Sequence, residues 1–355
     1  MSVAVAVRVT ERPPLARAEA RIDSLQLLRA VAAIMVAAFH LQAAGATNAG
    51  YDGAFSAFAR GDAGVDLFFV ISGFIIYSTA ERRRGQSAAS FLAARFFRIF
   101  PIYWTVLGIY LAAAGAAALL GISVGFKFSP ASLIASTLLL PHGAQIIDVA
   151  WTLAIEVLFY GVFAMTFFRF GARVFFAVMI AWSAASVLNR VDGPPATVLD
   201  FIFYPAVAEF LFGAAIAWAC QKRKLPFAGP ALVAGVLLLL VWLCGGYGGL
   251  DIGRQWGAGI PAALIVYGAA QSRAAIAPPL LLLGEASYIL YLTHLLAFSC
   301  LGRMFASFGL DLYASTSLMA VALVIGLSAA SLATIVIERP YQRWYRPLLA
   351  KWRPA

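Results

Sequence analysis

The sequence has few charged residues for its length. Asp, Glu, Lys and Arg make up 12% of its 355 residues, whereas hydrophobic residues make up 63%. A soluble globular domain carries about 25% charged residues. This composition excludes an ordinary soluble domain and predicts a polytopic membrane protein.

Cysteine and histidine are scarce as well. The three cysteines, Cys220, Cys244 and Cys300, lie in or beside apolar runs, and no CxxC pair occurs. Neither a disulfide framework nor a cysteine metal site is therefore indicated. The three histidines are scattered over separate elements, so we expect no metal site from them either. The net charge of +10 does not indicate nucleic acid, because the basic residues occur in short clusters between apolar runs.

Ten apolar runs predict an all-α protein with about ten transmembrane helices. Several runs approach the ~20 residues that span a bilayer, and the fifth, seventh and eighth are short. The apolar segment 131–140 is too short to cross and is bracketed by Pro130 and Pro141, so we expect an outer interfacial or re-entrant helix there. The ten runs cover roughly residues 25–43, 64–80, 100–120, 148–168, 174–188, 201–219, 230–244, 256–270, 280–300 and 316–337.

Lys and Arg are unequally distributed between the loops. With ten spans, twenty of the 26 fall on one side of the bilayer and five on the other, and Arg29 lies within the first span. Because basic loops stay in the cytoplasm, both termini are predicted to be cytoplasmic. Residues 1–24 then form a cytoplasmic tail before an uncleaved signal anchor. Residues 25–338 form the transmembrane domain, and residues 339–355 form a basic tail on the anionic inner leaflet.

The first apolar run contains two ionisable residues. Arg29 and His40 are eleven residues apart. At about 100° per residue, both side chains leave a helix on the same face, about 16 Å apart along its axis. Arg29 should lie near the inner leaflet and His40 near the outer one. Ionisable groups inside a membrane are costly and mark functional sites, so this pair predicts a site that reaches much of the way across.

The second run begins near Asp66, at the predicted depth of His40. A carboxylate there can hold the imidazole in one tautomer and stabilise its protonated form. An N-cap or helix-dipole contact is the alternative for Asp66. Glu209, near the middle of the sixth run, could partner Arg29 or another buried base.

The fourth run carries a polar stripe. In WTLAIEVLFY, the residues Thr152, Glu156 and Tyr160 follow one another at helical spacing on one face. A carboxylate at this depth must be paired or face a cavity. Functional and purely structural pairing both fit the pattern.

The ninth run, GEASYILYLTHLL, places His294 near the predicted level of His40. Tyr288 and Tyr291 precede it. Tyrosine hydroxyls and an imidazole suit hydrogen bonding to a sugar or an amide, but they also serve helix packing.

The loop between the second and third runs is rich in arginine. Arg95 and Arg98 are three residues apart and share a helix face. There they could clamp a phosphate-bearing cytosolic molecule. The preceding arginines 82–84 are explained by the tendency of basic loops to stay in the cytoplasm. The same tendency, without any ligand, is the alternative explanation for Arg95 and Arg98.

Six segments occur in a characteristic order: IDSLQLLRAVAAIMVAAFH, GVDLFFVISGFII, FLAARFFRIFPIYW, WTLAIEVLFY, SYILYLTH and IERP. Together they span nearly the whole chain and resemble the membrane-bound acyltransferase 3 family, which includes bacterial exopolysaccharide O-acetyltransferases. The resemblance implies an O-acyltransferase of the bacterial cytoplasmic membrane. Such an enzyme moves an acyl group, usually acetyl, from cytoplasmic acetyl-CoA to a hydroxyl of an extracytoplasmic carbohydrate such as an exopolysaccharide repeat unit.

The resemblance also implies roles for individual residues, with Arg29 and His40 as the shared motif pair. Acyl transfer from a thioester to an alcohol needs a base or a nucleophile, together with donors for the oxyanion. His40 is the candidate for the base, and an acyl-histidine intermediate stays open. We expect catalysis from His40, Asp66 and Arg29, acyl-CoA binding by Arg29, Arg95 and Arg98, and acceptor binding by Ser72, Glu156, Tyr288, Tyr291 and His294.

The partners implied are acyl-CoA, a carbohydrate acceptor that includes polyprenyl-linked forms, the lipid bilayer and polysaccharide-assembly proteins. A transporter or flippase for a lipid-linked sugar, with the buried charges as a proton relay, is the main alternative. The sequence contains no visible pair of inverted repeats that would favour it. A sensory or structural membrane protein is a third possibility, in which the buried Arg29 and His40 would be expendable. The acceptor sugar, the length of the acyl group and the oligomeric state stay open.

Overall fold

A computed structural model describes residues 14–83, 85–122, 128–143, 145–189, 191, 193–222, 226–247, 253–272 and 274–351. Every regular element within these residues is helical, which confirms the all-α class. The elements are α1 (Pro14–Ala49), η1 (Ala54–Phe58), η2 (Gly61–Ala63), α2 (Gly64–Arg82), α3 (Ala88–Leu119), α4 (Pro130–Leu138), η3 (Asp148–Ala150), α5 (Trp151–Phe170), α6 (Ala172–Leu188), α7 (Val198–Ile202), α8 (Val207–Lys222), α9 (Ala228–Leu243), α10 (Arg254–Gly257), α11 (Gly259–Ala269), α12 (Pro278–Ser307), η4 (Leu312–Ala314), α13 (Thr316–Ala333), the π-helix η5 (Thr334–Glu338) and α14 (Arg339–Lys351).

Seven helical segments are long and apolar enough to cross a membrane, so the chain is a multi-pass membrane protein. Each of the ten predicted runs falls on a helical stretch. The three runs expected to be short correspond to α6, α9 and α11, which have 17, 16 and 11 residues. The seven segments are Asp23–Ala49, Gly61–Arg82, Ala88–Leu119, Asp148–Phe170, Val198–Gln221, Pro278–Ser307 and Thr316–Leu349.

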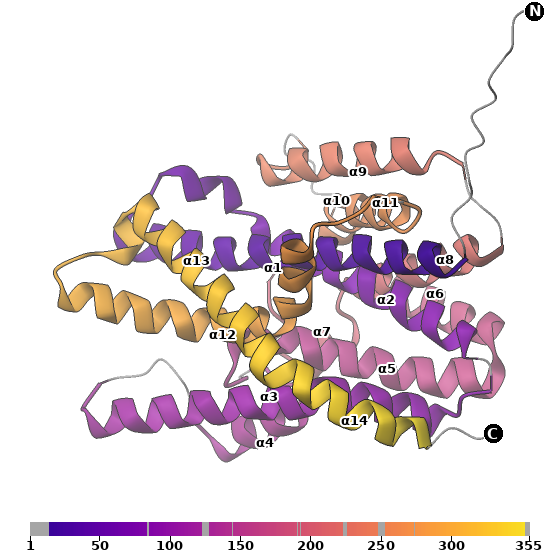
Figure 1. The fold of residues 1–355 in the computed structure, drawn as a ribbon, viewed down its shortest axis with the longest axis horizontal. Helices are drawn as coiled ribbons and strands as arrows, with labels where there is room; N and C mark the ends of the chain where they lie inside the picture. Colours follow the sequence, from indigo (N-terminus) through magenta and orange to yellow (C-terminus); the bar gives the residue numbers. More distant parts are fainter. Residues whose placement is uncertain are drawn as a thin grey trace, which may run out of the picture.

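Long helices define the shape of the molecule. Figure 1 shows α1, α3 and α5 along the long axis, while α13, η5 and α14 form one continuous helix that crosses them diagonally. The first described residues of α1 and the last of α14 lie on the same, right-hand side of the picture. The two ends of the described chain therefore lie at one end of the bundle.

The centre of the bundle forms where α2 packs closely against α8. A Cβ on Gly73 would overlap the backbone oxygen of Phe210, and one on Gly213 would overlap that of Val70. Small residues that let two backbones approach are typical of membrane helix pairs. The Phe210 ring stacks on Phe159 of α5 with 4.2 Å between ring centroids. This packing joins α2, α5 and α8, the first two of which carry site residues.

A second close pair is formed by α1 and α12, which run in the same direction. Near the start of α12, Gly284 lies so close to the backbone oxygen of Gln26 on α1 that a Cβ would not fit. Further along both helices, His294 contacts His40. The pair therefore holds the predicted histidines at one level.

The apolar segment between two prolines forms α4, which turns back along α3. Tyr103 donates from its hydroxyl to the carbonyl of Ser136 at 2.7 Å, and the Trp104 indole donates to the carbonyl of Thr137 at 2.8 Å. These aromatic residues lie about 15 residues, or about 23 Å, before the end of α3 at Leu119. The structure therefore confirms a short helix folded back against α3, which fits both predicted forms.

Candidate active site

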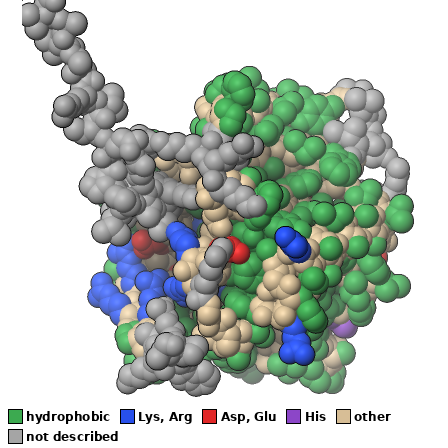
Figure 2. All heavy atoms as spheres, turned by 90° about the vertical axis from the view of Figure 1, so that its right-hand side faces the viewer, with side chains coloured by type: hydrophobic (Ala, Val, Ile, Leu, Met, Phe, Trp, Pro, Cys, Tyr) green, Lys and Arg blue, Asp and Glu red, His purple; other side chains and the backbone are tan. Residues whose placement is uncertain are grey.

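A cavity of about 580 Å³ lies between α1, α2, α3, α5, α12 and α14. Figure 2 looks onto the right-hand end of Figure 1, where Lys and Arg side chains gather in one area and hydrophobic side chains cover much of the rest. The excess of positive charge in the cavity suits a polyanionic ligand. Its charged lining residues are six arginines, Arg29, Arg82, Arg83, Arg95, Arg98 and Arg346, and two carboxylates, Glu156 and Glu338.

Several buried polar atoms in the cavity wall have no hydrogen-bond partner among the described residues. They are Nε of Arg95, Oγ of Ser78, Oγ of Ser287 and Oε2 of Glu338. Buried polar atoms are normally hydrogen-bonded. These four atoms come from four helical elements around the cavity, where a polar ligand could bond to them.

The three arginines predicted to bind acyl-CoA all line this cavity. Arg29 comes from α1, and Arg95 and Arg98 come from successive positions on one face of α3. The guanidinium of Arg95 lies 5.4 Å from the ring centroid of Phe91 and 5.9 Å from that of Tyr160. The two aromatic faces hold this side chain in place. The structure thus brings together the three arginines that the sequence predicted to lie on the cytoplasmic side of the membrane.

Glu156 is paired across two helices. Its Oε1 atom accepts hydrogen bonds from Ser72 of α2 at 2.7 Å and from Tyr160 of α5 at 2.6 Å. All three residues line the cavity. The polar stripe on α5 therefore faces the cavity, and Glu156 within it is also hydrogen-bonded to side chains. The structure is thus compatible with both the structural and the functional interpretation of this stripe.

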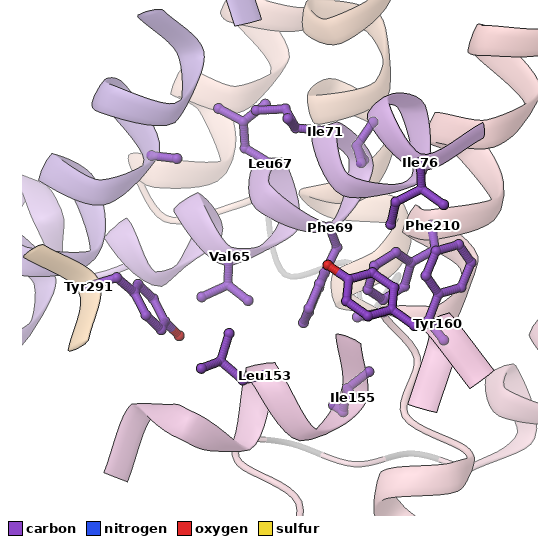
Figure 3. Close-up of a cluster of buried hydrophobic side chains, with 14 of the residues drawn as sticks. Val65, Leu67, Phe69, Ile71, Ile76, Leu153, Ile155, Tyr160, Phe210 and Tyr291 are labelled. Atoms are coloured by element: carbon purple, nitrogen blue, oxygen red, sulfur yellow. The ribbon is translucent and has the colours of Figure 1, made fainter. Parts of the chain in front are cut away.

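Tyr291 lies at the deep end of the cavity, furthest along α12 from the arginines. Its hydroxyl lies 2.9 Å from Oγ1 of Thr152, and both hydroxyls are within hydrogen-bond distance of the carbonyl of Val149, at 3.3 and 3.0 Å. Figure 3 shows the ring of Tyr291 pointing toward Val65 and Leu153. We call Tyr291, Thr152 and Val149 the tyrosine bar. By contrast, the hydroxyl of Tyr288 donates to the carbonyl of Ile99 at 2.9 Å.

His40 and His294 form a pair one helical turn beyond the tyrosine bar. Nε2 of His294 lies 3.2 Å from Nδ1 of His40. Nδ1 of His40 also lies 2.9 Å from the carbonyl of Val36, and Nδ1 of His294 lies 3.0 Å from that of Leu290. His294 is buried, with 1% of its surface exposed, whereas His40 is half-buried. Neither residue belongs to the cavity lining.

Asp66 does not orient His40, which corrects the sequence prediction. Both of its carboxylate oxygens lie 3.0 Å from Nε of Arg254, which donates to them, and Arg254 also binds Asp62. Asp66 is 1% exposed, and Glu209 is fully buried beside it, against Gly259. The alternative that paired Glu209 with Arg29 is therefore wrong as well. Asp66 belongs to a separate ionic cluster with Asp62 and Arg254, and Glu209 lies beside that cluster.

Comparison with known proteins now identifies the reaction class. Residues 22–337 match the family model described as an acyltransferase domain. The chain belongs to the acyltransferase 3 family. It is 32% identical over 298 residues to the exopolysaccharide production protein ExoZ of Rhizobium meliloti (strain 1021), an alignment that covers 81% of this chain and 91% of the relative. No solved structure matches the chain.

The family match covers the histidine pair and the part of the cavity lining that precedes Glu338. One residue of this acyltransferase was missed by sequence reasoning. Arg254 was not predicted as a site residue, although it completes the cluster with Asp62 and Asp66. The available signal was a basic residue two positions before the apolar run 256–270, on the side of the membrane predicted to hold five of the 26 basic residues. Among the described residues, no group of three or more His, Cys, Asp or Glu side chains is placed to hold a metal ion.

We expect Asp66→Asn to weaken the fold of this acyltransferase without slowing turnover by the folded enzyme. Removing the charge of Asp66 takes the buried partner from Arg254, which keeps its ion pair with Asp62, so we expect a loss of at most about 3 kcal/mol. Arg254 has 27% of its side chain exposed. Thermal unfolding in detergent should show a lower Tm, while the kcat of the folded fraction stays within about twofold of wild type, well below the contribution of a general base.

Asp52→Asn provides the matched control, because Asp52 is an exposed carboxylate in the loop before η1. It should leave both Tm and kcat unchanged. An Asp66→Asn protein with the wild-type Tm and a greatly reduced kcat would restore the role of Asp66 as the orienting acid.

Proposed function

We propose that this protein is an acyl-CoA-dependent O-acyltransferase that acetylates a hydroxyl of an exopolysaccharide, or of its lipid-linked precursor, at the outer face of a bacterial cytoplasmic membrane. One observation carries the proposal: an arginine-lined cavity ends at the tyrosine bar, one helical turn from a histidine pair. Membership of the acyltransferase 3 family and the similarity to ExoZ support the reaction class and the polymer.

The cavity suits acetyl-CoA as the donor. Coenzyme A carries several phosphate groups, and arginine binds phosphate through charge-assisted, often bidentate hydrogen bonds. Arg82, Arg83 and Arg346 would bind the nucleotide phosphates at the mouth, together with Arg95 and Arg98. The pantetheine arm would extend past Arg29 and the hydroxyl of Ser287 toward the tyrosine bar, which would bring the thioester to within about one helical turn of the histidines.

His40 would act on the acceptor hydroxyl from the far side of the bar. Its Nε2 atom takes the hydroxyl proton while the oxygen attacks the thioester carbon. The carbon–sulfur bond then breaks, and the proton passes to the departing thiolate to give CoASH. In the variant with an acyl-histidine intermediate, Nε2 attacks the thioester carbon and the carbon–sulfur bond breaks to release the thiolate. The acceptor hydroxyl then attacks the acyl-imidazole, the imidazole leaves, and the hydroxyl proton passes to the thiolate to give CoASH. Tyr291, from the bar, would turn its hydroxyl from Val149 and Thr152 to donate to the developing oxyanion.

The distribution of arginines supports an orientation with both termini in the cytoplasm. Arg82, Arg83, Arg95, Arg98 and Arg346 come from three separate helices, yet they surround one cavity. By the positive-inside rule, the excess of basic residues on this side would make it the cytoplasmic one. Acetyl-CoA would then enter from the cytoplasm, and the ten helical runs would form the complete transmembrane domain.

Two measurements on the same protein test this function. Surface polysaccharide from cells that lack the protein should lose the mass of one acetyl group per modified residue, and wild-type protein should restore it. Purified protein in lipid nanodiscs should transfer label from acetyl-CoA to polysaccharide from the deletion strain. Unmodified polysaccharide masses combined with no consumption of acetyl-CoA would overturn the proposal, and movement of a lipid-linked sugar without acetylation would identify a flippase instead.

A further inference from the structure

We propose that His294 is a positioning residue that fixes the tautomer of His40, so that Nδ1 of His40 carries the proton and Nε2 presents its lone pair to the reacting groups. This inference rests on the proposed function, in which His40 is the base or nucleophile. It replaces the role in acceptor binding that the sequence suggested for His294 with an indirect one.

The first step concerns the proton on His294. Its Nδ1 atom lies 3.0 Å from the carbonyl oxygen of Leu290. A carbonyl oxygen can only accept a hydrogen bond, so Nδ1 of His294 must carry the hydrogen. A neutral imidazole has one N–H group. Nε2 of His294 is therefore an acceptor, and it is the atom that faces His40.

The second step transfers this constraint to His40. Its Nδ1 atom lies 2.9 Å from the carbonyl oxygen of Val36 and 3.2 Å from Nε2 of His294. Both neighbours are acceptors, so Nδ1 of His40 must be the donor to them. The remaining nitrogen, Nε2, keeps its lone pair. Two backbone carbonyls and one imidazole thus define the reactive nitrogen without any carboxylate.

Burial separates the roles of the two rings. His294 is 1% exposed, and it packs against Tyr291 and Phe298 with centroid distances of 6.1 and 5.9 Å. Both of its ring nitrogens are occupied by Leu290 and His40, so it has no free nitrogen for an acceptor sugar. His40 is half-buried, and only its Nε2 atom is left to meet a reacting group.

The neighbouring charges are consistent with an imidazole as the orienting group. The acidic side chains whose charge reaches His40 are Asp62 and Asp148, which flank the starts of α2 and α5. Asp62 is engaged with Arg254, and the hydrogen-bond contacts of Nδ1 of His40 are to Val36 and His294. A neutral acceptor fixes the ring without adding a charge to the low-dielectric interior.

Two substitutions test the positioning role in the full-length protein. His294→Leu removes the acceptor at similar size, and we expect kcat for acyl transfer to fall at least about tenfold, as for other residues that orient a reacting group. The KM for acetyl-CoA should stay unchanged, because the cavity does not include His294. His294→Gln supplies an amide oxygen as acceptor and should recover part of kcat.

Nitrogen-15 NMR of labelled histidine reads the tautomer directly, independently of turnover. The chain has three histidines, so His142→Asn and His40→Ala suffice to assign the signals. Wild-type His40 should show a protonated Nδ1 and an unprotonated Nε2. In His294→Leu the carbonyl of Val36 remains as an acceptor for Nδ1, so we expect the Nδ1–H form to persist as the main tautomer while the fraction protonated at Nε2 rises measurably. A wild-type His40 protonated at Nε2, or full kcat in His294→Leu, would overturn the inference. Loss of the proposed function itself would instead appear as an inactive wild type or a fully active His40→Ala protein.

Discussion

Replacing His40 by alanine is expected to lower kcat for acetyl transfer by about 10²- to 10⁴-fold, the range that a positioned general base contributes. His40 is half-buried on α1, one helical turn beyond the deep end of the arginine-lined cavity. Its Nδ1 atom contacts Val36 and His294, so Nε2 is the nitrogen available for reaction. The rate of label transfer from acetyl-CoA to polysaccharide by protein in nanodiscs measures the effect. The KM for acetyl-CoA should change little, because His40 does not line the cavity.

The matched control is His142→Ala, which removes the other half-buried histidine, in the loop after α4. It should retain the wild-type rate. Both variants should show the wild-type Tm, so that a loss of rate reports chemistry and not folding. A His40→Ala protein that still acetylates at the wild-type rate would refute the assignment. Incubating wild-type protein with acetyl-CoA alone, followed by peptide mass analysis, separates an acyl-histidine intermediate from direct transfer.

The double substitution of Arg95 and Arg98 by glutamine is expected to weaken binding of acetyl-CoA by about 10²- to 10⁴-fold. A hydrogen bond to a charged group contributes about 1.5–3 kcal/mol, so two contribute about 3–6 kcal/mol, and each 1.4 kcal/mol is about tenfold in Kd. Both arginines line the cavity, and the buried Nε of Arg95 has no hydrogen-bond partner among the described residues. Isothermal titration with acetyl-CoA in the presence and absence of added salt measures the change.

Arg343→Gln is the control for this prediction, because Arg343 is exposed on α14 and does not line the cavity. It should bind acetyl-CoA as wild type does. Coenzyme A without its 3′-phosphate should bind wild-type protein more weakly than intact coenzyme A does. Its Kd should also differ less between wild type and the double variant. Wild-type affinity in the double variant would place the nucleotide outside this cavity.

The sequence could predict where residues lie along the direction of the helices. Hydropathy and loop charge assign a depth to each residue, and helical periodicity assigns a face, so Arg29, Arg95 and Arg98 were expected on the cytoplasmic side and are found around one cavity. The same reasoning placed His40 and His294 at one level, where they are in contact. Depth and face follow from local periodicity and therefore need no knowledge of neighbouring helices.

The lateral order of the helices could not be predicted in this way. Asp66 shared the predicted level of His40, but its partner is Arg254, 188 residues away along the chain. Which helices adjoin is decided by packing such as that of Gly73 against Phe210, which no single segment encodes. Depth along the membrane normal therefore suggested the wrong partner for Asp66. For the same reason, the contact of Tyr291 on α12 with α5 and the preceding η3, which forms the tyrosine bar, was not predicted.

The short tyrosine bar has an electrical consequence. Hydrocarbon normally insulates a membrane over about 30 Å, but here a polar cavity approaches the bar from one side and a half-buried His40 lies beyond it. A transmembrane voltage would therefore fall mainly across this short stretch. In the proposed orientation, the proton released by the outer hydroxyl ends on the inner thiol, and moving one charge through 100 mV releases about 2.3 kcal/mol. A negative cell interior would then drive acylation forward.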